Sequence, residues 1–120
     1  MTTETPQLTE LKLLQKSKTL ELLFADNTNF VLSCEYLRVF SPSAEVQGHG
    51  NAPMKIVPGK KHVNITSVEP VGHYGVKLIF DDEHASGIYS WQTLYDLGKN
   101  FKSNWQTYLT GLEKAGLARE

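Results

Sequence analysis

The chain has 120 residues, 40% of them hydrophobic, and a formal net charge of −1 at pH 7. This length fits one domain that buries its own core, and the hydrophobic content excludes an extensively disordered chain. The near-neutral charge argues against a nucleic-acid partner, because phosphate backbones are bound by strongly basic surfaces. A single cysteine cannot form an internal disulfide, and no apolar run is long enough to cross a bilayer. We therefore expect a cytoplasmic protein with no membrane contact.

Three short segments near the N-terminus alternate hydrophobic and polar residues, as strands packed on one face do. They span residues 11–16, 19–24 and 29–33. This pattern predicts an antiparallel meander, with a helix over Leu11–Leu14 as the alternative for the first segment. Residues 1–10 have no such period and are expected to be a flexible tail, so the domain would occupy residues 11–120.

A short helix is predicted after the third strand. Ser33 can cap it by accepting a backbone N–H, and the helix would cover Cys34–Val39 until Pro42 ends it. Residues 41–61 are then rich in Ser, Gly, Pro, Asn and His, which predicts a long irregular segment. Segments of this length in compact domains commonly carry function.

The second half of the chain alternates again and then becomes helical. Strands are predicted over residues 62–68, 75–80 and 88–89. The polar interval Asp82–Gly87 has the chemistry of a hairpin connection. Ser90 is predicted to cap a helix that stops at Gly98, and a capping box at Ser103 predicts a last helix that ends at Gly116.

These elements predict one α+β domain. It would have a mainly antiparallel sheet of about five strands, a short helix after the third strand and helices at the C-terminus. The core is expected to take hydrophobic side chains from both halves of the chain. They are Leu22, Phe24, Val31, Ile65, Leu78, Phe80, Trp91, Leu94, Trp105 and Leu109.

Three stretches of the chain resemble a known family. They read LRVFSPSAEVQGHG over residues 37–50, VEPVG over 68–72 and FDDEHASGIYSWQTL over 80–94. They are similar to small bacterial stand-alone domains that look like the N-terminal domain of gamma-butyrobetaine hydroxylase. The resemblance covers roughly residues 11–98 and implies the accessory domain alone, because the iron-dependent oxygenase chemistry belongs to a separate catalytic domain. Similar domains accompany a hydroxylase unit or an iron–sulfur-assembly ATPase, which implies docking or metal-related assistance.

The resemblance also implies a site that this chain has altered. In the hydroxylase-like domain, thiolates that follow a Leu-Arg pair bind zinc together with a hairpin histidine. Here His84 keeps the histidine, but the thiolate positions read Ser41, Ser43 and Val46. Serine hydroxyls ionise too weakly to replace thiolates on zinc, and valine cannot bind a metal. We therefore expect no stoichiometric zinc.

The function expected is that of a non-catalytic binding or accessory module with a protein partner. One exposed surface would be formed by the Ser41–Gly50 loop and the Asp82–Gly87 hairpin. The residues expected on this surface are Arg38, Ser41, Ser43, Glu45, His49, Asp82 and His84. The alternative is a metal-binding protein that assists iron or iron–sulfur handling, with a divalent metal on His49 and His84. A hydrolase or transferase is least favoured, because no Gly-x-Ser-x-Gly motif is present.

Overall fold

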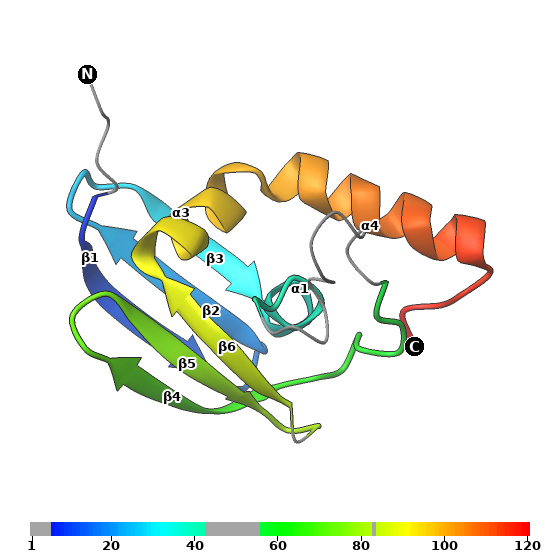
Figure 1. Ribbon diagram of the computed structural model, residues 1–120, viewed down its shortest axis with the longest axis horizontal. Coiled ribbons are helices and arrows are strands. Elements are labelled where there is room, and N and C mark those ends of the chain that lie inside the picture. Colours follow the sequence, from blue (N-terminus) through cyan, green and yellow to red (C-terminus); the bar gives the residue numbers. More distant parts are fainter. Residues whose placement is uncertain (1–5, 43–55, 83) are drawn as a thin grey trace.

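The computed structural model describes residues 6–42, 56–82 and 84–120, and Figure 1 shows how their elements are arranged. In chain order these are β1 (Leu8–Leu14), β2 (Thr19–Phe24), β3 (Asn29–Ser33), α1 (Cys34–Val39), β4 (Ile65–Val71), β5 (Gly75–Phe80), β6 (Ala85–Ser90), α3 (Trp91–Lys99) and α4 (Phe101–Ala115). None of the helices in these ranges has the length and apolarity that a bilayer crossing requires.

The strands form two antiparallel sheets, with strand orders β1-β2-β3 and β4-β5-β6. Successive side chains of a strand point to opposite faces, so each sheet buries alternate residues. The inner faces of both sheets supply one buried core cluster, to which Leu94 and Leu97 of α3 also belong. The α+β class is therefore confirmed, and the single sheet of about five strands is instead two sheets of three.

Most of the expected core positions are buried or pack against the core. Leu22, Phe24, Ile65, Leu78, Phe80 and Leu94 are each at most 1% exposed. Trp91, Trp105 and Leu109 are partly buried against the core. Val31 is wrong, because its side chain is 57% exposed. Its neighbour Leu32 pairs with the buried Leu20, which places Val31 on the outer face of the sheet.

Several element boundaries also differ from the prediction. Strand β1 begins at Leu8, inside the expected tail, because Leu8 pairs with Phe24 across the first hairpin. Strand β4 begins three residues later than expected, at Ile65. Helix α3 continues through Gly98 to Lys99. The glycine serves close packing there, because a Cβ at this position would lie 2.4 Å from the ring of Phe30.

Helix α1 is short but well determined by its sequence. The side chain of Ser33 accepts a hydrogen bond from the backbone N–H of Tyr36 at 3.0 Å, as predicted. Tyr36 is fully buried, and its hydroxyl donates to the carbonyl of Leu97 at 2.6 Å and accepts from Asn104 at 3.0 Å. The helix is thereby fixed to both α3 and α4.

Helix α4 begins at Phe101, before the predicted capping box, and Ser103 donates to the Asn100 carbonyl within its first turn. It ends as predicted at Gly116, which has a left-handed φ of 67°. The tail that follows runs beside the segment before β4. The backbone N–H of Gly59 donates to the Ala118 carbonyl at 3.0 Å, and a second such bond joins residues 61 and 119.

An ion pair ties this tail to α1. Arg119 donates from Nε and Nη2 to the two carboxylate oxygens of Glu35, at 2.9 and 2.7 Å. The Glu35 side chain is 5% exposed, and the guanidinium also lies over the Trp105 ring at 5.2 Å from its centre. This bidentate pair fastens the C-terminal tail to the start of α1, and Arg38, three residues further along the helix, contacts the β5–β6 turn through Asp82.

Candidate functional site

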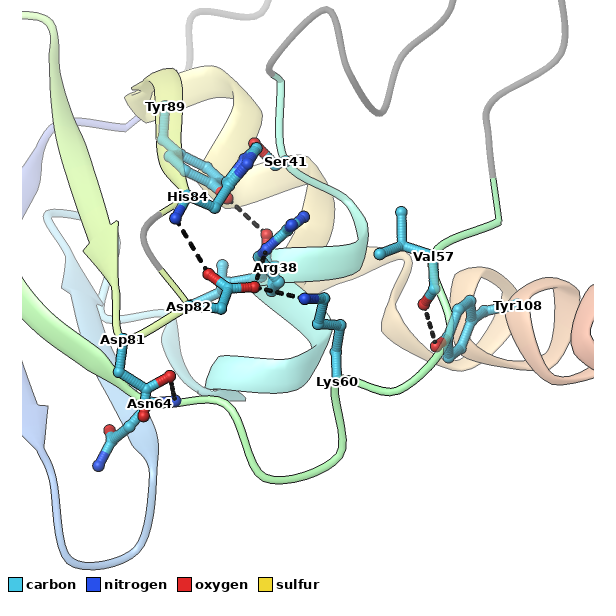
Figure 2. A network of polar contacts seen from close by, with 11 residues as sticks. Arg38, Ser41, Val57, Lys60, Asn64, Asp81, Asp82, His84, Tyr89 and Tyr108 are labelled. Carbon is cyan, nitrogen blue, oxygen red and sulfur yellow. Dashed lines mark hydrogen bonds and ion pairs between the residues drawn. The ribbon is translucent and has the colours of Figure 1, made fainter. Parts of the chain in front are cut away.

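A polar cluster lies where the end of α1 meets the turn between β5 and β6. We call it the hairpin corner, and Figure 2 shows it with its neighbours. It consists of Arg38, Ser41, Lys60, Asp82, His84 and Tyr89. Three separate segments of the chain therefore meet at one place: the end of α1, the residues before β4 and the hairpin.

The turn itself is organised by Asp82. Its Oδ1 accepts a hydrogen bond from the backbone N–H of His84 at 3.1 Å, the local closure that aspartate favours in turns. The preceding residue, Asp81, accepts from the backbone N–H of Asn64 at 3.1 Å and so joins the turn to the start of β4. The turn geometry aims the side chain of His84 toward α1 (Figure 2).

Inside the corner, buried hydrogen bonds hold Tyr89, Ser41 and His84 at the end of α1. Tyr89 donates its hydroxyl hydrogen to the carbonyl of Leu37. The hydroxyl of Ser41 lies 3.1 Å from Nε2 of His84, and the tautomer of the imidazole sets which of the two atoms donates.

Burial keeps the phenol of Tyr89 neutral. The phenol is fully buried, and loss of solvent raises its pKa well above the ordinary value, although the hydrogen bond from Ser41 acts in the opposite direction. Tyr89 therefore acts as a hydrogen-bonded link at any physiological pH.

At the outer side of the corner, Asp82 pairs with two cations. Its Oδ2 lies 2.9 Å from Nε of Arg38 and 2.6 Å from Nζ of Lys60. Partial burial alone would raise the pKa of this carboxyl. The hydrogen bonds from Lys60 and Arg38 outweigh that effect and lower the pKa to about 2. Asp82 is therefore ionised throughout the physiological range.

Arg38 is only partly satisfied by this arrangement. Its side chain is 10% exposed, and its Nε is used by Asp82. Its Nη1 is buried and has no hydrogen-bond partner among the residues that the structure describes. A buried charged donor without a partner lowers the stability of the folded state, so Nη1 is an energetically unfavourable atom of the corner.

The structure brings together four of the residues expected at the site: Arg38, Ser41, Asp82 and His84. Their contacts confirm that the end of α1 and the hairpin lie side by side. Their expected exposure is wrong, because Ser41 is 0%, His84 6% and Arg38 8% exposed. Pairing across the hairpin satisfies most of their polar atoms, Nη1 of Arg38 excepted, and this pairing permits their burial.

The other expected site residues, Ser43, Glu45 and His49, lie outside the described residues, as does most of the Ser41–Gly50 loop. Two members of the corner were missed. Lys60 belongs to a basic run that reads as a solvated loop, and Tyr89 reads as an ordinary strand residue. The pattern that placed Tyr89 in a strand beside the hairpin could have suggested its role, but nothing local points Lys60 at Asp82.

A metal ion does not fit the described part of the corner. No group of three His, Cys, Asp or Glu side chains converges anywhere in residues 6–42, 56–82 and 84–120. Nε2 of His84 faces the hydroxyl of Ser41, and the Asp82 carboxylate is taken by two cations. Positive charge from Arg38 and Lys60 opposes a further cation beside them.

A catalytic role for the Ser41–His84 pair has little chemical support. The pair has the separation of a nucleophile and its base. Ser41 is completely buried. A substrate carbonyl would have no approach to this oxygen.

The fold and the corner define a class of small α+β domain, built of two antiparallel sheets, in which a hairpin histidine is fixed against a short helix. The family model of the gamma-butyrobetaine hydroxylase-like N-terminal domain matches residues 11–95. The chain belongs to this family. Comparison with curated proteins gave no match.

Solved structures agree with this assignment. Two proteins whose structures were determined in solution by NMR are 52% and 42% identical to the chain, each with a TM-score of 0.84. The alignments cover 100% and 98% of this chain and 91% and 92% of theirs. A crystal structure of a protein of unknown function from Acidithiobacillus ferrooxidans ATCC 23270, of the DUF971 family, is 39% identical with a TM-score of 0.65. The alignment covers 77% of this chain and 92% of the chain of that protein.

Proposed function

We propose that this chain is a non-catalytic binding or accessory module that docks a cytoplasmic protein partner at the hairpin corner. The surface would comprise the Asp82–Gly87 hairpin, the adjoining Lys60 and the loop that starts at Ser41. The observation that carries this proposal is that two cations, Arg38 and Lys60, share one oxygen of Asp82 at an edge that is partly open to solvent.

Hydrogen bonds that order the inner side chains of the corner support recognition. The hairpin is held to α1 by the Ser41–His84 contact, by the hydrogen bond from Tyr89 to Leu37 and by the Arg38–Asp82 pair. A site whose side chains are already ordered loses less conformational entropy when a partner binds. The corner therefore has the preformed geometry that specific docking favours.

Charge at the edge supports a polar partner surface. The side chains of Lys60 and Asp82 are 23% and 20% exposed. Lys61 and His62 follow directly and are exposed, although both lie near the carboxylate of Glu120. Charged groups of this kind at an interface set the orientation and rate of association more than its total affinity.

The test is affinity capture with wild-type chain, followed by identification and purification of the captured protein. Its dissociation constant is then measured for the wild type, Lys60→Gln and the matched control Lys102→Gln, which removes the same charge at an exposed position on α4. We expect Lys60→Gln to weaken binding at least 5-fold (about 1 kcal/mol) and the control to bind as the wild type does. Equal affinities for all three would refute docking at the corner.

A further inference from the structure

The unpartnered guanidinium nitrogen of Arg38 indicates what chemical group the corner receives. Nη1 is buried, and the whole side chain is 10% exposed, so solvent does not compensate the missing partner. The opposite edge of the same guanidinium is occupied, because Nε donates to Asp82 at 2.9 Å. One nitrogen of this planar, charged donor group is thus held in place, while another is enclosed and has no partner among the described residues.

The acidic groups around Arg38 in the described residues are already committed. Asp82 uses Oδ2 for Arg38 and Lys60 together and Oδ1 for the backbone N–H of His84. Asp81 is turned to the backbone of Asn64. Glu35, one helical turn before Arg38, gives both oxygens to Arg119. Among the described residues, two cations therefore face one carboxylate, and one positive charge is left without a counterpart.

An oxyanion satisfies both the charge and the geometry. The guanidinium fork matches two oxygens of a planar carboxylate, and the ammonium of Lys60 offers a second positive donor to the same group. A single negative charge balances the single uncompensated positive charge, whereas a phosphate dianion would exceed it and would lie beside Asp82. The charge balance therefore favours a carboxylate.

We propose that Arg38 and Lys60 form a binding site for a carboxylate of the partner protein, supplied by an acidic side chain or by a C-terminus. This inference rests on the proposed function, since it names the group that docks at the corner. Nη1 itself is enclosed, so the carboxylate enters on the partly exposed side of Lys60 and moves that flexible side chain as it reaches the guanidinium. Asp82 remains paired with Nε of Arg38 and holds the guanidinium in position.

The first arm of the test uses small anions and ¹⁵N-labelled protein. The backbone amide resonance of His84, whose N–H donates to Asp82 beside the site, is followed during titration with sodium acetate, and separately with inorganic phosphate, against sodium chloride at equal ionic strength. We expect a saturable shift with acetate that is at least 5-fold weaker in Arg38→Lys, which keeps the charge and loses the fork. Lys102→Gln should titrate as the wild type does. Absence of a saturable acetate shift in the wild-type protein would overturn the site, whatever the variants do.

Phosphate distinguishes the two oxyanions. Saturation by phosphate without saturation by acetate would overturn the assignment to a carboxylate. Saturation by acetate, with phosphate weaker or equal, supports it.

The second arm uses the purified partner with its acidic residues at the interface changed to amides. We expect this partner to lose at least 5-fold in affinity for the wild-type chain and much less for Arg38→Lys. A partner that depends on Lys60 but not on its own carboxylates would overturn this inference and leave the proposed function standing. Acetate binding without any dependence of the partner on Lys60 would refute docking at the corner and would overturn the partner as the source of the carboxylate, leaving only the affinity of the site for a carboxylate.

Discussion

Two arginine–carboxylate pairs flank the same short helix, and they differ in how completely they are satisfied. Arg119 and Glu35 pair through two hydrogen bonds, and the guanidinium also covers the Trp105 ring. Arg38 meets Asp82 through one nitrogen, shares that oxygen with Lys60 and leaves Nη1 buried without a described partner. The first pair fastens the C-terminal tail to the domain. The second is a preformed but incomplete set of donors, which is the property expected of a recognition site.

The largest effect on stability should follow from breaking the Arg119–Glu35 pair. In Arg119→Met the buried carboxylate of Glu35 loses both of its hydrogen bonds, and we expect the free energy of unfolding to fall by about 2–3 kcal/mol, near the lower limit for buried pairs because Arg119 is partly exposed. Urea unfolding measures this. Arg119→Lys, which keeps the charge and loses the fork, should fall between the wild type and Arg119→Met. A loss under about 0.5 kcal/mol would show that the tail is not fastened by this pair.

The inner hydrogen-bond chain should give the next largest effect. His84→Ala removes a buried ring and its hydrogen bond with the hydroxyl of Ser41, so we expect a loss of about 1–3 kcal/mol. Thermal and urea unfolding should agree on this value. A neutral His84→Ala would mean that the hairpin histidine is an exposed surface residue, as the sequence first suggested.

Acid should lower the stability of the protein by protonating Asp82 of the Arg38–Asp82 pair. Its pKa is lowered in the folded protein to about 2 from a reference value of 3.8, so the folded state favours the ionised form. The resulting stability is complete above about pH 4 and is lost as the pH falls toward about 2, an effect of about 1 kcal/mol after screening by solvent. Unfolding curves at pH 5 and pH 2.5 should show this loss in the wild type and not in Asp82→Asn. A steeper acid loss in Asp82→Asn would contradict the assignment.

Truncation of Arg38 should have the smallest effect on the free energy of unfolding. Arg38→Met keeps most of the aliphatic packing and removes a buried donor that lacks a partner, while Asp82 retains Lys60. We expect the unfolding free energy to stay within about 1 kcal/mol of the wild type. A loss as large as that of Arg119→Met would show that both pairs are structural.

The sequence predicted the local structure well where the pattern has a single physical reading. Alternation placed Leu22 and Phe80 in the core, and the cap at Ser33 and the stop at Gly116 were both confirmed. It failed where tertiary contacts decide. Gly98 lies inside a helix because the ring of Phe30 packs against its backbone, and Val31 is exposed because the strand register selects Leu32 for the inner face.

The site was predicted only in part for the same reason. The resemblance placed His84 near the residues after Leu37 and Arg38, and the structure confirms that His84 contacts Ser41. A loop-like polar sequence predicts exposed side chains, but Arg38, Ser41 and His84 each contact a polar residue from another segment and are buried. Lys60 reaches Asp82 across 22 positions of sequence, a contact that no local pattern encodes.

The central claim is that the Arg38–Asp82 pair serves recognition and the Arg119–Glu35 pair serves folding. The most direct measurement is the dissociation constant of the captured protein partner for Arg38→Met and for Arg119→Met, at a temperature where circular dichroism shows both variants to be folded. The account predicts at least a 10-fold loss of affinity (about 1.4 kcal/mol) for Arg38→Met and wild-type affinity for Arg119→Met. Wild-type affinity in Arg38→Met, with the loss confined to Arg119→Met, would contradict it and move the recognition surface to the C-terminal tail.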